Sequence, residues 1–130
     1  MAALLIVDDE EAIRDTLYDL FSESHLCHVA ETADRAIVWL DGESYDVVLT
    51  DISMPGMSGV ELLGHVRQRQ PDTPVIVMSG ISDQDHAEGL LRLGAFDFLL
   101  KPFKLEEVEQ CVERAIERHK QLAEVRGQEI

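Results

Sequence analysis

Five short apolar runs alternate along the chain with segments whose apolar residues recur at helical spacing. The runs are continuous, as is typical of strands buried on both faces of a parallel sheet; they occupy residues 3–7, 27–30, 46–50, 74–78 and 96–100. The helical segments run from about 11 to 22, 33 to 40, 60 to 66, 87 to 93 and 105 to 122, with Asp41-Gly42 and Gly94 as expected stops. Because parallel neighbours need right-handed crossovers, this order predicts an α/β fold: a doubly wound five-stranded parallel sheet flanked by five helices.

Composition limits both the size and the partners of the protein. The chain has 130 residues, 45% of them apolar, which suits one domain with a buried core. Eleven Lys and Arg against 26 Asp and Glu give a net charge of −15, which disfavours direct binding of nucleic acid or of an anionic membrane by this domain. No apolar run approaches the roughly 20 residues of a bilayer span, and the N-terminus lacks the basic start of a secretory signal. Cys27 and Cys111 form no disulfide framework, so we expect a reduced, cytoplasmic location.

Polar residues follow four of the five predicted strands. They are Asp8, Asp9 and Glu10 after the first strand, Asp51 after the third, Ser79 after the fourth and Lys101 after the fifth. Ligands of open parallel sheets bind outside the carboxyl ends of the strands. The sequence therefore predicts that these side chains meet at one edge of the sheet.

Each of these residues also has an ordinary structural interpretation. Asp8 or Asp9 could cap the next helix, Asp51 or Ser79 could belong to a turn, and Lys101 could extend into solvent. Independent turn residues, however, need not supply three carboxylates, a hydroxyl and an ammonium at one edge. Carboxylates in this arrangement repel one another and attract a hard cation such as Mg²⁺, beside which a carboxylate can attack a phosphoryl group. The metal, the ammonium and the hydroxyl would then balance the phosphoryl charge.

Four segments of the sequence resemble the receiver domain of two-component response regulators. They are residues 7–10 (Val-Asp-Asp-Glu), 49–59 (Leu-Thr-Asp-Ile-Ser-Met-Pro-Gly-Met-Ser-Gly), 77–80 (Val-Met-Ser-Gly) and 100–103 (Leu-Lys-Pro-Phe). The resemblance runs in order from about residue 3 to about residue 122. We therefore expect residues 1–122 to form a receiver domain, and residues 123–130 to form a C-terminal tail or the start of a linker to an output domain that this chain lacks.

The resemblance implies a flavodoxin-like strand order, 2-1-3-4-5, and a role for each matching residue. Asp51 matches the phosphoacceptor, Ser79 the switch hydroxyl, and Lys101 the lysine that pairs with the phosphate. Direct ligands of Mg²⁺, or of Mn²⁺ in its place, match Asp9, Asp51 and the backbone carbonyl of Ser53, while Asp8 matches an acid that reaches the ion through water. A cis Lys101-Pro102 bond is implied as well, and only bonds before proline make that isomer accessible at low cost.

Phe98 and the last helix bear on how a receiver signals. Phe98 lies where the family often has an aromatic switch residue, although a core aromatic on an apolar strand explains it equally well. The family usually changes the surface formed by its fourth helix, fifth strand and fifth helix. The stripe of the last helix, in steps of three and four, is also typical of a coiled-coil seam; its residues are Leu105, Val108, Val112, Ala115, His119 and Leu122. A homodimer through that surface or through the extended helix is therefore an expectation.

The resemblance implies a signalling switch that takes its phosphoryl group from a histidine kinase or a phosphotransfer protein. We expect no enzyme beyond limited self-phosphorylation and self-dephosphorylation. The main alternative is a pseudo-receiver, a phosphorylation-independent interaction module of the same fold. A phosphatase with an aspartyl nucleophile would want an acid where Ser53 stands, and an FMN carrier would avoid the acids at residues 8–11.

The residue two positions after Ser79 generates a first prediction. In the family, side chains at this position and at Ser53 flank the path of the hydrolytic water, and Ile81 is apolar. We expect Ile81 to shield an acyl phosphate on Asp51, so Ile81→Glu should shorten its lifetime. The loss of phosphoryl label from the purified, phosphorylated protein measures this rate. An unchanged rate in Ile81→Glu would contradict the shielding role.

Overall fold

In the parts of the chain that the structure, a computed structural model, describes (residues 1–54, 56–80 and 84–128), five parallel strands form one sheet in the order β2-β1-β3-β4-β5. The strands are β1 (Ala3–Val7), β2 (Leu26–Ala30), β3 (Val47–Asp51), β4 (Val75–Ser79) and β5 (Asp97–Leu100). This order confirms the predicted flavodoxin-like topology. The register aligns the strand ends: Val7 pairs with Thr50, Asp51 with Met78, and Ser79 with Leu100. The residues that follow the strands are therefore brought to one edge.

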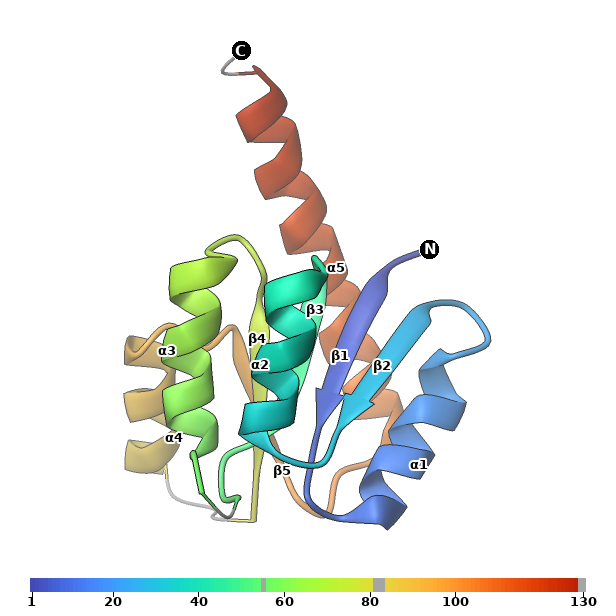
Figure 1. The fold of residues 1–130 in the computed structure, drawn as a ribbon, viewed down its shortest axis with the longest axis vertical. Coiled ribbons are helices and arrows are strands. Elements are labelled where there is room, and N and C mark those ends of the chain that lie inside the picture. Colours follow the sequence, from blue (N-terminus) through green and yellow to red (C-terminus); the bar gives the residue numbers. More distant parts are fainter. Residues whose placement is uncertain (55, 81–83, 129–130) are drawn as a thin grey trace.

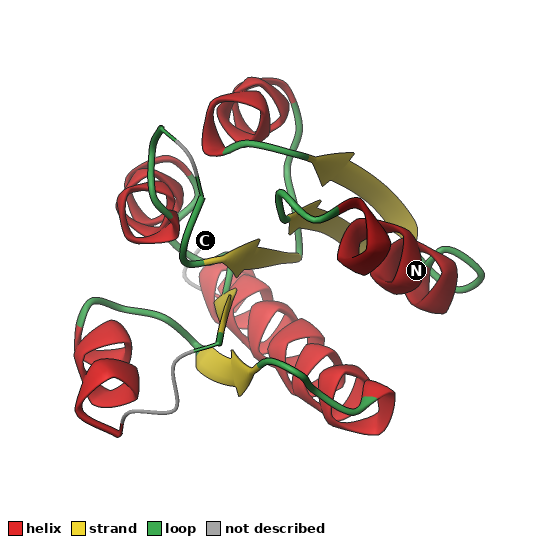
Figure 2. Ribbon diagram, turned by 90° about the horizontal axis from the view of Figure 1, so that it is seen from below, coloured by secondary structure: helices red, strands yellow, loops and turns green. Residues whose placement is uncertain are grey.

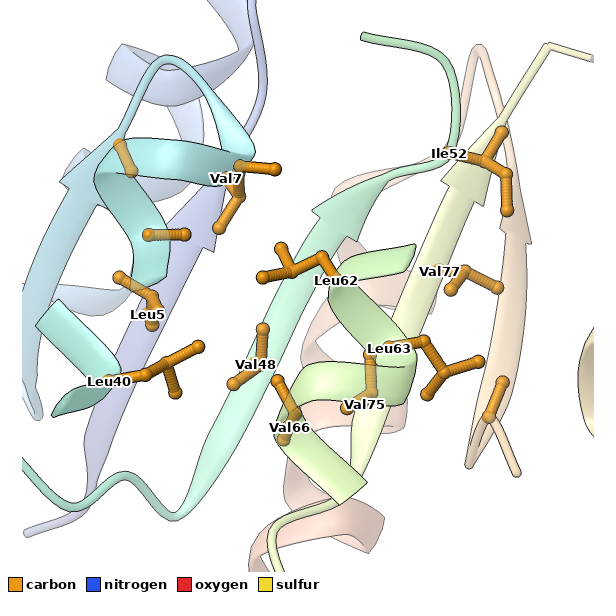
Figure 3. Packing of buried hydrophobic residues seen from close by; sticks show 14 of the residues in the cluster. Leu5, Val7, Leu40, Val48, Ile52, Leu62, Leu63, Val66, Val75 and Val77 are labelled. Carbon is orange, nitrogen blue, oxygen red and sulfur yellow. The ribbon is translucent and has the colours of Figure 1, made fainter. Parts of the chain in front are cut away.

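Helices cover both faces of the sheet, as the apolar strands require (Figure 2). One layer contains α2 (Ala33–Gly42), α3 (Gly59–Arg69) and α4 (Gln84–Arg92). The other contains α1 (Glu11–Phe21) and α5 (Leu105–Gln128). Successive strand residues alternate between the layers, so that Leu5 and Val7 pack towards α2 and α3 while Leu4 and Ile6 pack towards α1 and α5. Figure 3 shows Val48, Leu62 and Val66 packed together in the first layer.

Two strands end one residue later than the sequence pattern predicts. β3 and β4 run to Asp51 and Ser79, so that these residues are the last of their strands. The reason is that the hydrogen-bond ladder continues beyond the apolar runs: Ile52 N–H donates to the Met78 carbonyl (2.9 Å) and Lys101 N–H to the Ser79 carbonyl (2.8 Å). Asp51 and Ser79 are consequently held by the sheet, more rigidly than loop residues would be.

The second helix stops at Gly42, within the predicted Asp41-Gly42 pair, but not by the glycine conformation expected of a helix stop. Gly42 is the last helical residue and does not adopt a positive φ; among the described residues only Gly56 and Gly94 do. The helix ends because Glu43 is extended (φ −137°, ψ 151°). The side-chain amide of Gln70 donates to the carbonyls of Leu40 and Glu43, which satisfies groups that the helix leaves open.

The last helix begins in the core and continues beyond the sheet (Figure 1). Val108, Val112 and Ala115 are buried against the strands, whereas the next seam position, His119, pairs with Asp46 (Nδ1–Oδ1 2.8 Å). The helix runs on to Gln128, so the described part of the predicted tail, 123–128, is helical. The proposed domain boundary at residue 122 stays a prediction. None of the helices in the described ranges combines the length and apolar character that a bilayer span needs.

The two thiols give a prediction about this packing. Burial raises the pKa of Cys27 to about 11, and burial followed by the charge of Asp97 raises that of Cys111 to about 12. Relative to the ordinary thiol pKa of 9.0, the Cys27 thiolate fraction at pH 8 falls about a hundredfold. Iodoacetamide should therefore modify both cysteines slowly in the native protein and rapidly in urea, as mass spectrometry would measure. Equal native and denatured rates would contradict the burial.

Candidate functional site

Four of the polar residues predicted to meet lie together at the carboxyl edge of the sheet. Asp8 follows β1, Asp51 and Ser79 end β3 and β4, and Lys101 follows β5. Asp8 is 0% exposed, Asp51 5% and Ser79 1%. Charged groups at such depth need partners, so this edge must either pair them internally or bind ions.

Lys101 is the cation that pairs with these acids. Its Nζ lies 2.8 Å from Asp8 Oδ2, 3.5 Å from Glu10 Oε1 and 3.6 Å from Asp51 Oδ2. Burial alone would lower the pKa of Lys101, but the hydrogen bond to Asp8 and the charges of Asp8, Asp51 and Glu10 outweigh it and raise that pKa. The ammonium is therefore held in its charged form. The Lys101-Pro102 bond is cis, as predicted.

Burial and neighbouring charges act on the carboxyl group of Asp51 in opposite directions. Its pKa is raised to about 6, first by burial and then by the negative charge of Asp8, with a smaller contribution from Asp9. Lys101 and the Ser53 N–H, which donates to Asp51 Oδ1 (3.3 Å), lower it but do not compensate. The pocket thus holds more negative charge than Lys101 neutralises, and a further cation would stabilise the ionised form of Asp51.

The loop between β1 and α1 holds the remaining acids in place. Asp8 Oδ1 accepts a hydrogen bond from the Glu10 N–H (2.9 Å), and the Asp8 carbonyl accepts one from Arg14 Nη1 (2.8 Å). The residue that caps α1 is Glu10, whose side chain makes no capping hydrogen bond. Asp8 and Asp9 are therefore not helix caps, which removes the ordinary interpretation considered for them.

Carboxylate oxygens of Asp8, Asp9 and Glu10 lie within 4.8 Å of one another, the one such cluster found among the described residues. Closely spaced carboxylate oxygens are the donors that Mg²⁺ prefers, so the residues present fit this ion. The cluster differs from the predicted ligand set, because it includes Glu10 and does not include Asp51. The roles predicted for Asp51 and for the Ser53 carbonyl in metal binding stay predictions.

Sequence reasoning missed the contributions of Glu10 and Arg14. The sequence places Glu10 at the strand end but gives it no role in the site, and no periodicity distinguishes Arg14 from the other polar residues of its helix. The one signal for Arg14 is its position one helical turn after Glu10, where its N–H donates to the Glu10 carbonyl (3.1 Å). Its reach to the Asp8 carbonyl depends on the path of the loop.

Phe98 lies on β5 next to the site and faces the layer of α2, α3 and α4. Its ring is half-buried and meets His86 of α4 edge-on, with ring centroids 6.2 Å apart. This packing accounts for Phe98 as a core aromatic and leaves its role as a switch untested. Ile81, expected to shield the site, and Pro55, which belongs to a matching segment, lie outside the described residues.

Comparison with known proteins agrees with the resemblance described from the sequence. A sequence model of the family described as the response regulator receiver domain matches residues 4–113. The DNA-binding transcriptional regulator NtrC of Salmonella typhimurium is 39% identical over 126 residues, which cover 96% of this chain and 27% of that protein. The chain therefore spans about a quarter of the length of this NtrC and of the regulatory protein AtoC of Escherichia coli.

Solved structures agree with this assignment. The crystal structure of NtrX from Brucella abortus has a TM-score of 0.90 and 35% identity, over 98% of this chain and 29% of that one. The response regulator protein TrrA from Thermotoga maritima, solved in complex with Mg²⁺ and BeF, has a TM-score of 0.78 and 31% identity, over 88% of this chain and 99% of that one. The site described above thus belongs to a fold shared with response regulators.

Gly59 generates a prediction about how the site is supported. It is the first residue of α3, its N–H donates to the Ile52 carbonyl (3.0 Å), and a Cβ there would lie 2.2 Å from the Asp51 carbonyl oxygen. Gly59→Ala should therefore push α3 away from the end of β3 and cost about 1–3 kcal/mol of stability in urea unfolding. Gly64→Ala is the matched control, because no atom beyond its own stretch of helix lies within 4 Å of an added Cβ, and it should stabilise the same helix by up to about 1 kcal/mol. Equal effects at the two positions would contradict the close approach.

Proposed function

Because this chain belongs to the receiver-domain family of two-component response regulators, we propose that it accepts a phosphoryl group on Asp51 in a Mg²⁺-dependent reaction. The donor is the phosphohistidine of a histidine kinase or of a phosphotransfer protein. The observation that carries the proposal is the position of Lys101, whose Nζ lies 2.8 Å from Asp8 and 3.6 Å from Asp51 at the buried edge of the sheet. An ammonium so placed can balance a phosphoryl group built on Asp51.

In the proposed transfer, an oxygen of the Asp51 carboxylate attacks phosphorus and forms an acyl phosphate. The P–N bond to the donor imidazole breaks, and the leaving nitrogen keeps the electron pair and takes up a proton. Asp9, Asp51 and the Ser53 carbonyl would hold Mg²⁺, or Mn²⁺ in its place, with Asp8 contributing through water. When bound, the ion supplies positive charge for the phosphoryl oxygens. The Mg²⁺ and BeF of the TrrA structure support this assignment by likeness.

The phosphorylated state changes the electrostatic balance of the edge. Asp51 gains the negative charge of the phosphoryl group, so Lys101 and the hydroxyl of Ser79 are drawn towards it. Phe98 carries no phenolic hydroxyl, so if its ring turns inward after phosphorylation, that position would be stabilised by burial alone. We propose this chemistry as a switch with limited self-dephosphorylation and without turnover of a separate substrate.

A cavity of about 370 Å³ next to Lys101 suits the donor protein. It is lined by Ile13, Pro102 and Phe103 together with Glu10 and Lys101. Apolar side chains beside a charged reaction centre can dock a protein surface while the phosphohistidine reaches Asp51. The pseudo-receiver alternative gains no support, because Asp8, Asp51 and Lys101 make the contacts that the chemistry needs.

For the output, we propose the surface formed by α4, β5 and α5, or the extended part of α5, as the face that a homodimer or an output domain uses. Leu91, Leu100 and Leu105 are 45%, 40% and 40% exposed on these elements. By likeness to NtrC, which is named a DNA-binding regulator, the output in the whole protein would act on DNA. The charge of −15 disfavours direct DNA binding by this domain itself. The cytoplasmic location stays a prediction.

The phosphoacceptor is tested with a small donor, because the cognate kinase is unknown. Incubation with Mg²⁺ and acetyl phosphate or phosphoramidate should add the mass of one phosphoryl group to the wild-type protein, and a chelator should prevent it. Asp51→Asn should abolish the modification, whereas Asp19→Asn, which removes an exposed acid on α1, should not. Intact-protein mass spectrometry makes the measurement. Modification that persists in Asp51→Asn, or that is absent from the wild type with both donors, would refute the proposal.

A further inference from the structure

Glu10 shares Lys101 with the proposed phosphoacceptor. The Lys101 ammonium lies 3.5 Å from Glu10 Oε1 and 3.6 Å from Asp51 Oδ2, so the two carboxylates contact it from nearly equal distances. Asp8 binds the same ammonium at 2.8 Å. The Glu10 side chain is 60% exposed, whereas that of Lys101 is 15% exposed. Glu10 is therefore the solvent-facing member of the group of acids around Lys101.

The backbone fixes where the Glu10 side chain starts. Its N–H donates to Asp8 Oδ1, and the residue stands at the beginning of α1. From there a Glu10 carboxylate oxygen also lies within 4.8 Å of oxygens from Asp8 and Asp9. One exposed carboxylate thus lies near the ammonium of Lys101 and near the acids that would hold a metal ion.

We propose that Glu10 is a positioning residue that competes with the phosphoryl group for Lys101 while adding to the attraction of the site for Mg²⁺; this rests on the proposed function. Before transfer, Asp8 and Glu10 hold the ammonium on the side of the first strand. After transfer, the phosphoryl oxygens on Asp51 need the same ammonium, and the Glu10 carboxylate both retains it and repels them. Its effect on the metal has the opposite sign, because a carboxylate attracts a divalent cation.

The competing role predicts opposite changes in the affinities for Mg²⁺ and for a phosphoryl analogue when Glu10 is replaced, and a purely structural role does not. Glu10 makes no side-chain capping hydrogen bond and is largely exposed, so replacing its carboxylate by an amide keeps its size and disturbs little packing. A residue that merely shaped the loop would weaken both ligands when replaced. A charge that competes for Lys101 weakens one ligand and strengthens the other.

The experiment compares Glu10→Gln with Glu11→Gln in the full chain. Glu11 is the adjacent exposed acid, so its replacement removes the same charge, and among the described residues Lys101 pairs with Glu10 and not with Glu11. Calorimetry or NMR titration measures the Kd of Mg²⁺ alone, and then the Kd of beryllofluoride at saturating Mg²⁺. Glu10→Gln should weaken Mg²⁺ binding about threefold or more and tighten beryllofluoride binding about threefold or more, as expected for one charge at this range. Glu11→Gln should change each constant less than about twofold.

Each outcome decides between the two roles. Weakening of both ligands by Glu10→Gln, or constants equal to those of Glu11→Gln, overturns the competition while the wild type still binds Mg²⁺ and beryllofluoride. A wild-type protein that binds neither ligand refutes the proposed function and this inference with it. The mass-spectrometric test of Asp51 separates these cases, because it does not depend on Glu10.

Discussion

The contact between Lys101 and Asp8 is the interaction on which the site depends. Asp8 is fully buried at the end of β1, and a carboxylate at that depth is stable only with a partner. The partner comes from beyond β5, although β3 and β4 stand between these strands in the sheet. Lys101 therefore crosses the ends of β3 and β4, which places its ammonium beside Asp51. The pairing of one buried acid thus fixes the cation that a second acid uses.

This arrangement leaves the pocket short of positive charge. Lys101 contacts three carboxylates, and the pKa of Asp51 still stands at about 6 because burial and Asp8 outweigh that single ammonium. The hydrogen bonds of the sheet oppose relaxation, since Asp51 and Ser79 end their strands within a continuing ladder. The fold consequently stabilises a cluster of like charges that would separate in a looser loop. A divalent cation bound beside these acids would relieve this repulsion.

The sequence predicted the fold and the buried site residues for the same reason. Continuous apolar runs require cover on both faces, which leads to a parallel sheet, and a parallel sheet brings the residues after its strands together. The features that were missed depend on tertiary contacts without a periodic signal. Gln70, from the loop after α3, donates to the Leu40 carbonyl at the end of α2, and Arg14 donates to the Asp8 carbonyl across the β1–α1 loop. The sequence alone does not distinguish Glu10 from other exposed acids, because its role depends on the position of Lys101.

The last helix connects this edge of the sheet with the opposite one. Lys101 stands shortly before α5 begins at Leu105, and the buried stripe through Val108, Val112 and Ala115 fastens the helix along the sheet. At its other end, His119 pairs with Asp46 before β3 and Arg126 pairs with Asp72 before β4. Two polar residues on the outer part of α5 thus pair with residues at this opposite edge of the sheet. Because α5 begins four residues after Lys101, the proposed competition for that ammonium takes place close to the start of this helix.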